Sequence, residues 1–147
     1  MNMTLVGSEN TIRSIMSASL VTVDMQDTVR RVEEILNQHN LSSVPVIDPE
    51  RHDCFGIISL KDIAHFNAAK RNPNAVLAWE MCTYKPLTAS PQSSIEEVAR
   101  LMLEHQIHHV VVVEHGVLKG LVSSLDVVAA YLRRSSGHVD AQFGGRK

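Results

Sequence analysis

Apolar and polar residues follow two periodicities along this chain, and the same order of periods occurs twice. Apolar residues spaced three and four positions apart predict two amphipathic helices, with Val29, Val32, Ile35 and Leu36 in the first, and Ile95, Val98, Leu101 and Met102 in the second. Two β-branched runs follow each helix, at residues 44–47 and 55–58 and again at 110–113 and 118–122. Polar turns at 48–53 and 114–116 separate the runs, so each pair predicts a β-hairpin.

An internal repeat explains this recurrence. A shift of 66 positions places Thr22 on Thr88 and Val32 on Val98. Beyond the hairpins the shift is 64, and the segment 56–62 falls on the segment 120–126. Matched periodicity followed by a matched septet indicates two copies of one structural unit.

Each copy has the same expected order of strand, helix, two strands and second helix. The leading strands are expected at 20–23 and 87–89, and the second helices from 60 to about 70 and from 124 to about 134. We therefore expect a first repeat over 11–70, a linker over 71–78, a second repeat over 79–134 and a flexible C-terminal tail over 135–147. Because the runs at 44–47 and 110–113 are apolar on both faces, we predict an α/β (α+β) fold of two β-α-β-β-α repeats, packed sheet to sheet about a pseudo-twofold axis.

Polar residues mark where the first helix of each copy begins. The expected N-cap is Asp27 or Thr28 in the first copy and Ser93 or Ser94 in the second. A glutamate at 96 or 97 would complete a capping box in the second copy.

Composition and charge narrow the class of protein. The 147 residues are 44% hydrophobic and carry a formal net charge of −2, so we expect no broad basic surface for nucleic acid. No apolar run reaches the ~18–20 residues of a membrane helix, and the segment 1–16 lacks the pattern of a signal peptide. Cys54 and Cys82 have the spacing of neither a disulfide scaffold nor a zinc ribbon. We expect a cytoplasmic protein with no membrane or nucleic-acid partner.

The repeated septet has the pattern G-h-h-S-x-x-D, which places a hydroxyl and a carboxylate at each expected strand-to-helix junction. Ser59 and Ser123 would lie beside unpaired backbone N–H groups at a helix N-terminus, an arrangement suited to phosphate. Asp62 and Asp126, three residues on, could accept both hydroxyls of a ribose. A capping box in each copy is the simpler interpretation, and it is compatible with ligand binding.

The element order, the two septets and the Val-Pro-Val sequence at 44–46 together resemble a tandem pair of CBS domains, the Bateman module, from residue 11 to about 132. The resemblance implies a stand-alone regulatory or sensor module that binds adenosine-containing ligands, such as AMP, ADP or ATP, in clefts between the repeats. This chain departs from the family pattern at two points. The second copy has Val111 where the first copy has Pro45, and both septets have serine in place of threonine.

The resemblance also implies which further residues line the clefts. By position these are Val21, Leu87, Leu41, Ser42, Ile107 and His108. The aliphatic side chains would sandwich an adenine, and backbone groups beside them would read its edge. The basic pair His108-His109 stands where related regulatory subunits place residues that reach phosphates.

Other functions find little support in the sequence. The chain has no nucleophile elbow, no H-E-x-x-H motif and no Walker loop, so we expect no enzymatic activity and no catalytic cofactor. Histidines at 105, 108, 109 and 115 are joined by no carboxylate or thiol in a tetrahedral set, so we expect no metal site. Two alternatives stay open: a structural dimerisation module with empty or degenerate clefts, and a small hydrolase acting on nucleotides.

The expected partners follow from the same comparison. Apolar positions on the first helices, Leu36, Met102 and Leu103, would remain uncovered by one pair of repeats. Since CBS pairs dimerise through these helices, we expect a homodimer. No catalytic, channel or DNA-binding domain accompanies the repeats, so a downstream target would be a separate effector protein. The sequence does not select among AMP, ADP, ATP, S-adenosylmethionine and dinucleotides.

Overall fold

The computed structural model describes residues 10–18 and 20–143, with side chains as far as residue 135. Its centre consists of two small mixed sheets, one in each half of the molecule. The first sheet has the order β1-β2-β3-β4, formed by Val23–Asp24, Ser43–Asp48, Asp53–Ser59 and Thr83–Tyr84. The second has the order β5-β6-β7, formed by Thr88–Ala89, His109–Glu114 and Val117–Ser123. In each sheet the leading strand runs parallel to the next, and the hairpin is antiparallel.

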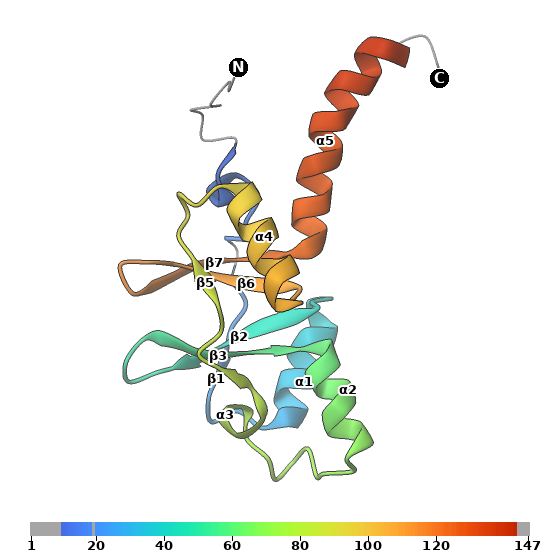
Figure 1. Ribbon diagram of the computed structural model, residues 1–147. Helices are drawn as coiled ribbons and strands as arrows, with labels where there is room; N and C mark the ends of the chain where they lie inside the picture. Colours follow the sequence, from blue (N-terminus) through green and yellow to red (C-terminus); the bar gives the residue numbers. More distant parts are fainter. Residues whose placement is uncertain (1–9, 19, 144–147) are drawn as a thin grey trace.

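Helices cover the outer face of each sheet (Figure 1). The first half carries α1 (Val29–Gln38) and α2 (Leu60–Ala68), and the second carries α4 (Ile95–His105) and α5 (Ser124–Phe143). Two short helices, η2 (Ile12–Ser14) and α3 (Ala78–Met81), precede the leading strands. The two sheets face each other between these helical layers (Figure 1), which confirms the expected α/β architecture of two paired repeats.

Burial on both faces explains the uninterrupted apolar strands. On β2, Val44 and Val46 belong to the core under α1 and α2, while Pro45 between them points to the opposite face and is also buried. On β6, Val110 and Val112 belong to the core of the second half, and Val111 on the other face has no exposed surface. The second face of each strand is therefore covered by the other sheet.

The segment before each leading strand packs against the opposite half of the molecule. The Ala78 amide donates to the Asp27 carbonyl at 2.7 Å, and 66 positions earlier the Ile12 amide donates to the Ser93 carbonyl at 2.9 Å. Ile12 accordingly belongs to the core of the second half, and β4 extends the first sheet by pairing with β3. The sequence predicted two continuous repeats, 11–70 and 79–134. In the structure, the segment at the start of each one packs in the opposite half, so the two halves exchange these segments.

The structure shows which of the two candidate N-cap residues begins the first helix of each repeat. Thr28 accepts from the Arg31 amide, and Ser94 accepts from the Glu97 amide. With Ser94 as N-cap, the residue that would complete the expected capping box is Glu97, and no return bond from the Ser94 amide to the Glu97 carboxylate forms among the described residues. The Glu96 carboxylate accepts from Arg100 at 2.7 Å. Reciprocal boxes form at the second helices, as described below.

Two features differ from the expected exposure and helix length. Leu36 and Met102, expected on an uncovered surface, are only 1% and 6% exposed, because they point into the cores beneath their own helices. Leu103 is 80% exposed, as expected. Helix α5 continues to Phe143 rather than ending near Arg134, through a stretch without proline. The last residues of the expected tail, 144–147, lie outside the described part.

No helix among the described residues is both long enough and apolar enough to cross a membrane.

Candidate ligand-binding cleft

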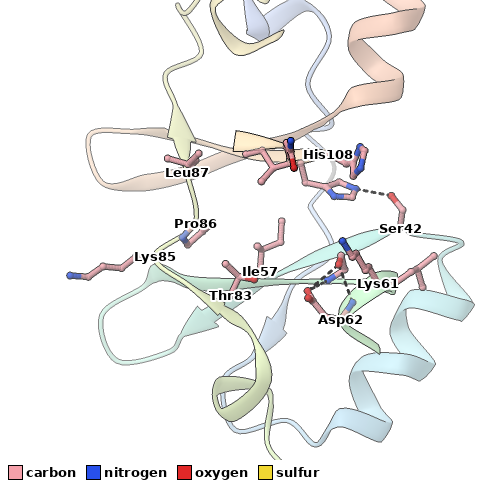
Figure 2. A pocket seen from close by; sticks show the side chains of 14 residues that line it. Ser42, Ile57, Lys61, Asp62, Thr83, Lys85, Pro86, Leu87 and His108 are labelled. Atoms are coloured by element: carbon pink, nitrogen blue, oxygen red, sulfur yellow. Dashed lines mark hydrogen bonds between the residues drawn. The ribbon is translucent and has the colours of Figure 1, made fainter. Parts of the chain in front are cut away.

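A cavity of about 460 Å³ lies between the two halves. Its walls come from β3 and the start of α2 in the first half, the connection from β4 to β5, and the start of β6 with the residues before it. Figure 2 shows the lining side chains, which are Ser42, Ile57, Ser59, Leu60, Lys61, Asp62, Thr83, Lys85, Pro86, Leu87, Gln106, Ile107, His108 and His109. The site therefore combines apolar walls with one carboxylate and several basic side chains.

The first septet folds into a reciprocal capping box at the cavity wall. The Asp62 Oδ2 atom accepts from the Ser59 amide at 2.7 Å and from the Ser59 hydroxyl at 3.0 Å. In return, the Asp62 amide donates to Ser59 Oγ at 3.2 Å. Both bonds to the carboxylate reach Oδ2, and no hydrogen bond within the described residues uses Oδ1 of Asp62. The box thus fixes the carboxylate and leaves one oxygen available to a ligand.

The second septet has the same local geometry. Asp126 Oδ2 accepts from the Ser123 amide at 2.8 Å, and the Asp126 amide donates to Ser123 Oγ at 3.2 Å. Both motifs are therefore capping boxes, as the simpler interpretation predicts. Ligand binding is compatible with them, because the second carboxylate oxygen is not used by the box.

The backbone amides at these junctions are less available than the sequence suggested. The Leu60 amide donates to the Ser42 carbonyl at 2.9 Å, and the Ser124 amide donates to the His108 carbonyl at 2.8 Å. The amides of Ser59 and Ser123 are engaged by the capping boxes. The expectation of unpaired N–H groups is therefore corrected for these four amides, which are not free to bind an anion.

The same backbone bonds bring distant parts of the site together. Ser42 directly precedes β2. The bond from the Leu60 amide holds it against the first turn of α2, next to the septet. Across the cavity, Ser42 Oγ lies 3.0 Å from His109 Nε2 (Figure 2). This side-chain hydrogen bond joins the first half to the second.

Two basic groups of different character face the cavity. Burial, reinforced by the neighbouring His108, lowers the pKa of His109 below the ordinary value of 6.5, and the Asp126 and Asp62 carboxylates oppose this shift. His109 is therefore largely neutral at neutral pH. Lys61 is exposed, and Figure 2 shows its nitrogen directed toward the space between the halves. Lys85 also lines the cavity, but its side chain extends away from it (Figure 2).

The cavity brings together seven of the residues expected at a ligand site, namely Ser42, Ser59, Asp62, Leu87, Ile107, His108 and His109. Val21 and Leu41 are half-buried against the core of the first half instead. Ser123 and Asp126 occupy the corresponding junction of the second half. The expected set is thus divided between two positions related by the repeat.

Sequence reasoning missed half of the lining. The residues it did not name are Ile57, Leu60, Lys61, Thr83, Lys85, Pro86 and Gln106. Lys61 stands inside the septet, so its charge was a signal that could have been used. Thr83, Lys85 and Pro86 reach the cavity only because the connection between the halves crosses it, which no local pattern reveals.

Cysteine and histidine chemistry contributes little to this region. Within the described residues, no three histidine, cysteine or acidic side chains are grouped so as to hold a metal ion. Cys54 and Cys82 are free, partly buried thiols. Burial raises the pKa of Cys54 to about 11, which keeps it protonated and unreactive at neutral pH.

Comparisons with known proteins agree with this architecture. Hypoxic response protein 1 of Mycobacterium tuberculosis is 27% identical over 135 residues, which cover 90% of each chain. The crystal structure of CBSX2 in complex with AMP has a TM-score of 0.74 and 25% identity, and covers 85% of this chain and 98% of that one. The CBS domain pair of protein MJ0100, solved with 5′-methylthioadenosine and S-adenosyl-L-methionine, has a TM-score of 0.77 and 25% identity over 84% of this chain and 97% of its own.

The CBS domain family itself matches at two places, residues 12–68 and 78–133, which correspond to the two repeats. The first match begins at η2 and the second at α3, the two equivalent segments that cross to the opposite half. The chain belongs to the CBS domain family and carries two CBS domains in tandem, the pairing known as a Bateman module.

Proposed function

We propose that this protein is a regulatory module that binds an adenosine-containing ligand between its two CBS domains, without turning it over. The observation that carries the proposal is the Asp62 carboxylate, which is fixed at the cavity wall by Ser59 while one of its oxygens is left unused. An acceptor-only group held in this way suits the two hydroxyls of a ribose. Solved relatives that contain AMP, methylthioadenosine and S-adenosylmethionine support this ligand class.

The remaining lining has complementary chemistry. Ile57, Leu87 and Ile107 supply aliphatic surface on both sides of the cavity, which suits the flat faces of an adenine. His108, His109 and the hydroxyl of Ser42 lie near the contact between the halves, where phosphates would extend. Ser123 and Asp126, with Val21 and Leu41, would form the equivalent site of the second domain.

Assembly into a homodimer is part of the same proposal. Leu103 on α4 and Val128 and Leu132 on α5 are 80%, 50% and 57% exposed. On α5 the two side chains are four residues apart, so they lie on one face of the helix and form an apolar stripe. A stripe of this kind usually marks an interface, and a second copy would cover it. The regulated target would then be a separate effector protein.

Calorimetric titration of the full chain with adenosine and with AMP tests the binding proposal. Asp62→Asn keeps an acceptor for the Ser59 amide but removes the carboxylate charge, so the fold should persist. Loss of a charge-assisted hydrogen bond should weaken binding about tenfold at the affected site. Asp126→Asn should do the same at the other site, and the double variant should lose both.

Two results would contradict the proposal. Absence of adenosine and AMP binding by the wild-type protein would favour the alternative, a structural dimerisation module with empty clefts. Unchanged affinity in the double variant would show that the carboxylates do not hold the ribose. Release of products from AMP or ATP during the titration would indicate a hydrolase instead.

A further inference from the structure

The repeat places a second site, here called the second cleft, around Ser123 and Asp126, with a backbone equivalent to that of the cavity but with different side chains. The equivalence is visible in matched hydrogen bonds: the Leu60 amide donates to the Ser42 carbonyl at 2.9 Å, and the Ser124 amide donates to the His108 carbonyl at 2.8 Å. At the repeat shifts of 64 and 66 positions, Lys61 corresponds to Leu125, and His109 corresponds to Ser43. Lys61 and His109 of the cavity therefore have neutral counterparts in the second cleft.

Lys61 is the cation best placed to bind an anion in the cavity. It lines the cavity, and its nitrogen is directed between the halves (Figure 2). The ion pairs found in the described part of the chain involve other residues, so its charge is not already neutralised there. The adjacent backbone amides of Ser59 and Leu60 are already engaged, so the positive charge available to a phosphate here is that of the Lys61 side chain. Lys85 does not compete for this role, since its nitrogen lies 5.5 Å from the ring centroid of Tyr84, away from the cavity.

The second cleft offers no such cation at the corresponding place. Leu125 is 75% exposed and apolar, and Ser43 is 3% exposed with an unpartnered hydroxyl. Ser42 and His108 occupy equivalent positions in the two repeats, so each takes the place of the other when the halves are exchanged. Both clefts would therefore contain this same pair, and the pair does not distinguish one cleft from the other. The distinction in charge therefore rests on Lys61, while His109 adds a titratable group that Ser43 does not match.

A backbone difference points in the same direction. The Val111 amide donates to the Leu87 carbonyl at 3.2 Å, so that carbonyl is occupied beside the cavity. Pro45, at the equivalent position, has no N–H to offer to the carbonyl of Val21. The Val21 carbonyl therefore lacks this bond and can accept from the amino group of an adenine. The second cleft is better equipped for the base, and the first for a negative charge.

We propose that the two clefts take different classes of adenosine ligand: the Lys61 cleft takes a phosphorylated one, and the Ser123–Asp126 cleft takes one without phosphate. The inference rests on the proposed function, since it assumes that both clefts accept adenosine. Lys61 is then the residue that sets ligand class, and Leu125 is its neutral counterpart. One protein could in this way respond to a nucleotide and to an uncharged or cationic adenosine compound together.

Exchanging the two residues tests this inference. Calorimetry with AMP and with adenosine would be carried out on the wild-type chain, Lys61→Leu, Leu125→Lys and, as a charge-matched control, Lys119→Leu on the exposed face of β7. We expect one strong AMP site per chain in the wild type. In Lys61→Leu the ratio of AMP to adenosine affinity should fall about tenfold. Leu125→Lys should gain a second strong AMP site, and Lys119→Leu should match the wild type.

The possible results distinguish a failure of this inference from a failure of the proposed function on which it rests. An AMP-to-adenosine ratio in Lys61→Leu equal to that of the wild type, or two equal AMP sites in the wild-type chain, would overturn the assignment of ligand classes while leaving adenosine binding in place. A Leu125→Lys variant with no added AMP site would overturn the role given to position 125. Failure of the wild type to bind adenosine or AMP would instead overturn the proposed function itself.

Discussion

The hydroxyl of Ser42 and the Nε2 atom of His109 lie 3.0 Å apart, and they join the two CBS domains through side chains that also line the cavity. Ser42 precedes β2 of the first domain, and His109 begins β6 of the second. A ligand that draws His109 toward itself would therefore act on a contact between the domains. This is a route by which occupancy could change how the two halves are held together.

His109 should make the stability of the fold depend on pH. Because burial and His108 hold its pKa in the folded chain below the ordinary 6.5, the unfolded chain binds a proton that the folded chain does not. The contribution of neutral His109 is fully present above about pH 6.5 and is lost as the pH falls toward its folded pKa. The free energy of unfolding should thus decrease on acidification through this window.

Urea unfolding at several pH values checks this expectation. His109→Gln retains a hydrogen-bonding partner for Ser42 but cannot titrate, so its stability should fall less between pH 7.5 and 5 than that of the wild type. His65→Gln, which changes an exposed histidine on α2, serves as the control. An acid loss in His109→Gln equal to that of the wild type would assign the effect to other groups.

Binding of AMP should strengthen as the pH falls from ~8 to ~6. A phosphate beside His109 favours its protonated form, so the complex takes up a proton. His108 opposes this protonation, and the Asp126 and Asp62 carboxylates favour it. The positive charge of Lys61, which also lines the cavity, would oppose it as well. The second ionisation of the phosphate itself, near ~6, limits the gain at the acid end. Calorimetry in buffers of different ionisation enthalpy would measure the proton uptake directly.

Adenosine provides the control for this pH effect, because it has no phosphate and should bind with little dependence on pH. In His109→Ala the AMP profile should become as flat as that of adenosine. A variant with the wild-type slope would remove His109 from the phosphate site.

The exchanged segments should make Gly56 intolerant of a side chain. A Cβ added there would lie 2.6 Å from Cys82 Sγ and 2.7 Å from the Thr83 carbonyl oxygen. That carbonyl belongs to β4, which cannot move without disturbing its pairing with β3. Gly56→Ala should therefore destabilise the protein by about 1–3 kcal/mol in chemical denaturation.

Gly120 is the matched position in the second domain. Its added Cβ would meet the Met16 sulfur at 2.8 Å and the Ser17 carbonyl at 3.0 Å, and the methionine side chain is flexible. Gly120→Ala should therefore cost less than Gly56→Ala. Equal stability of Gly56→Ala and wild type would show that β4 does not pack as closely as described.

The homodimer predicts a mass of twice 16.3 kDa by light scattering at micromolar concentration. Leu103→Asp combined with Val128→Asp would place charges on the exposed apolar positions of α4 and α5, and should yield folded monomers. Circular dichroism of the double variant would check that the chain remains folded. A wild-type mass near 16.3 kDa would refute the dimer.

Local patterns in the sequence predicted the elements of each repeat well. The three-and-four spacing of Val29, Val32 and Ile35 corresponds to α1, whose N-cap is one of the two residues expected. The hairpins were visible because β-branched runs flank polar turns, and the structure pairs Val44 with Ile58 and Val110 with Val122. The repeat then implied the pairing of the two halves, since neither half has enough apolar surface to cover both faces of its sheet.

Features that depend on the packing of distant segments could not be predicted from the sequence. The crossing of Ile12 and Ala78 to opposite halves is set by hydrogen bonds to Ser93 and Asp27, which no periodicity encodes. Leu36 was assigned to an outer surface, yet it is buried because the apolar face of α1 is broad enough to include it. In the cleft, the septet residues were found, but the connection through Thr83, Lys85 and Pro86 was not, because its place follows from the segment exchange.

Nuclear magnetic resonance of the isotope-labelled full chain, titrated with AMP, tests the central claim most directly. The account predicts that amide signals of the cavity wall shift together and saturably, above all those of Ser59, Lys61 and Asp62 on one side and Ile107 and His109 on the other. Asp62→Asn should abolish or strongly weaken these shifts while leaving the spectrum of a folded protein. Saturable shifts confined to other surfaces, or no shifts at all with AMP, would contradict the claim that this cleft binds an adenosine-containing ligand.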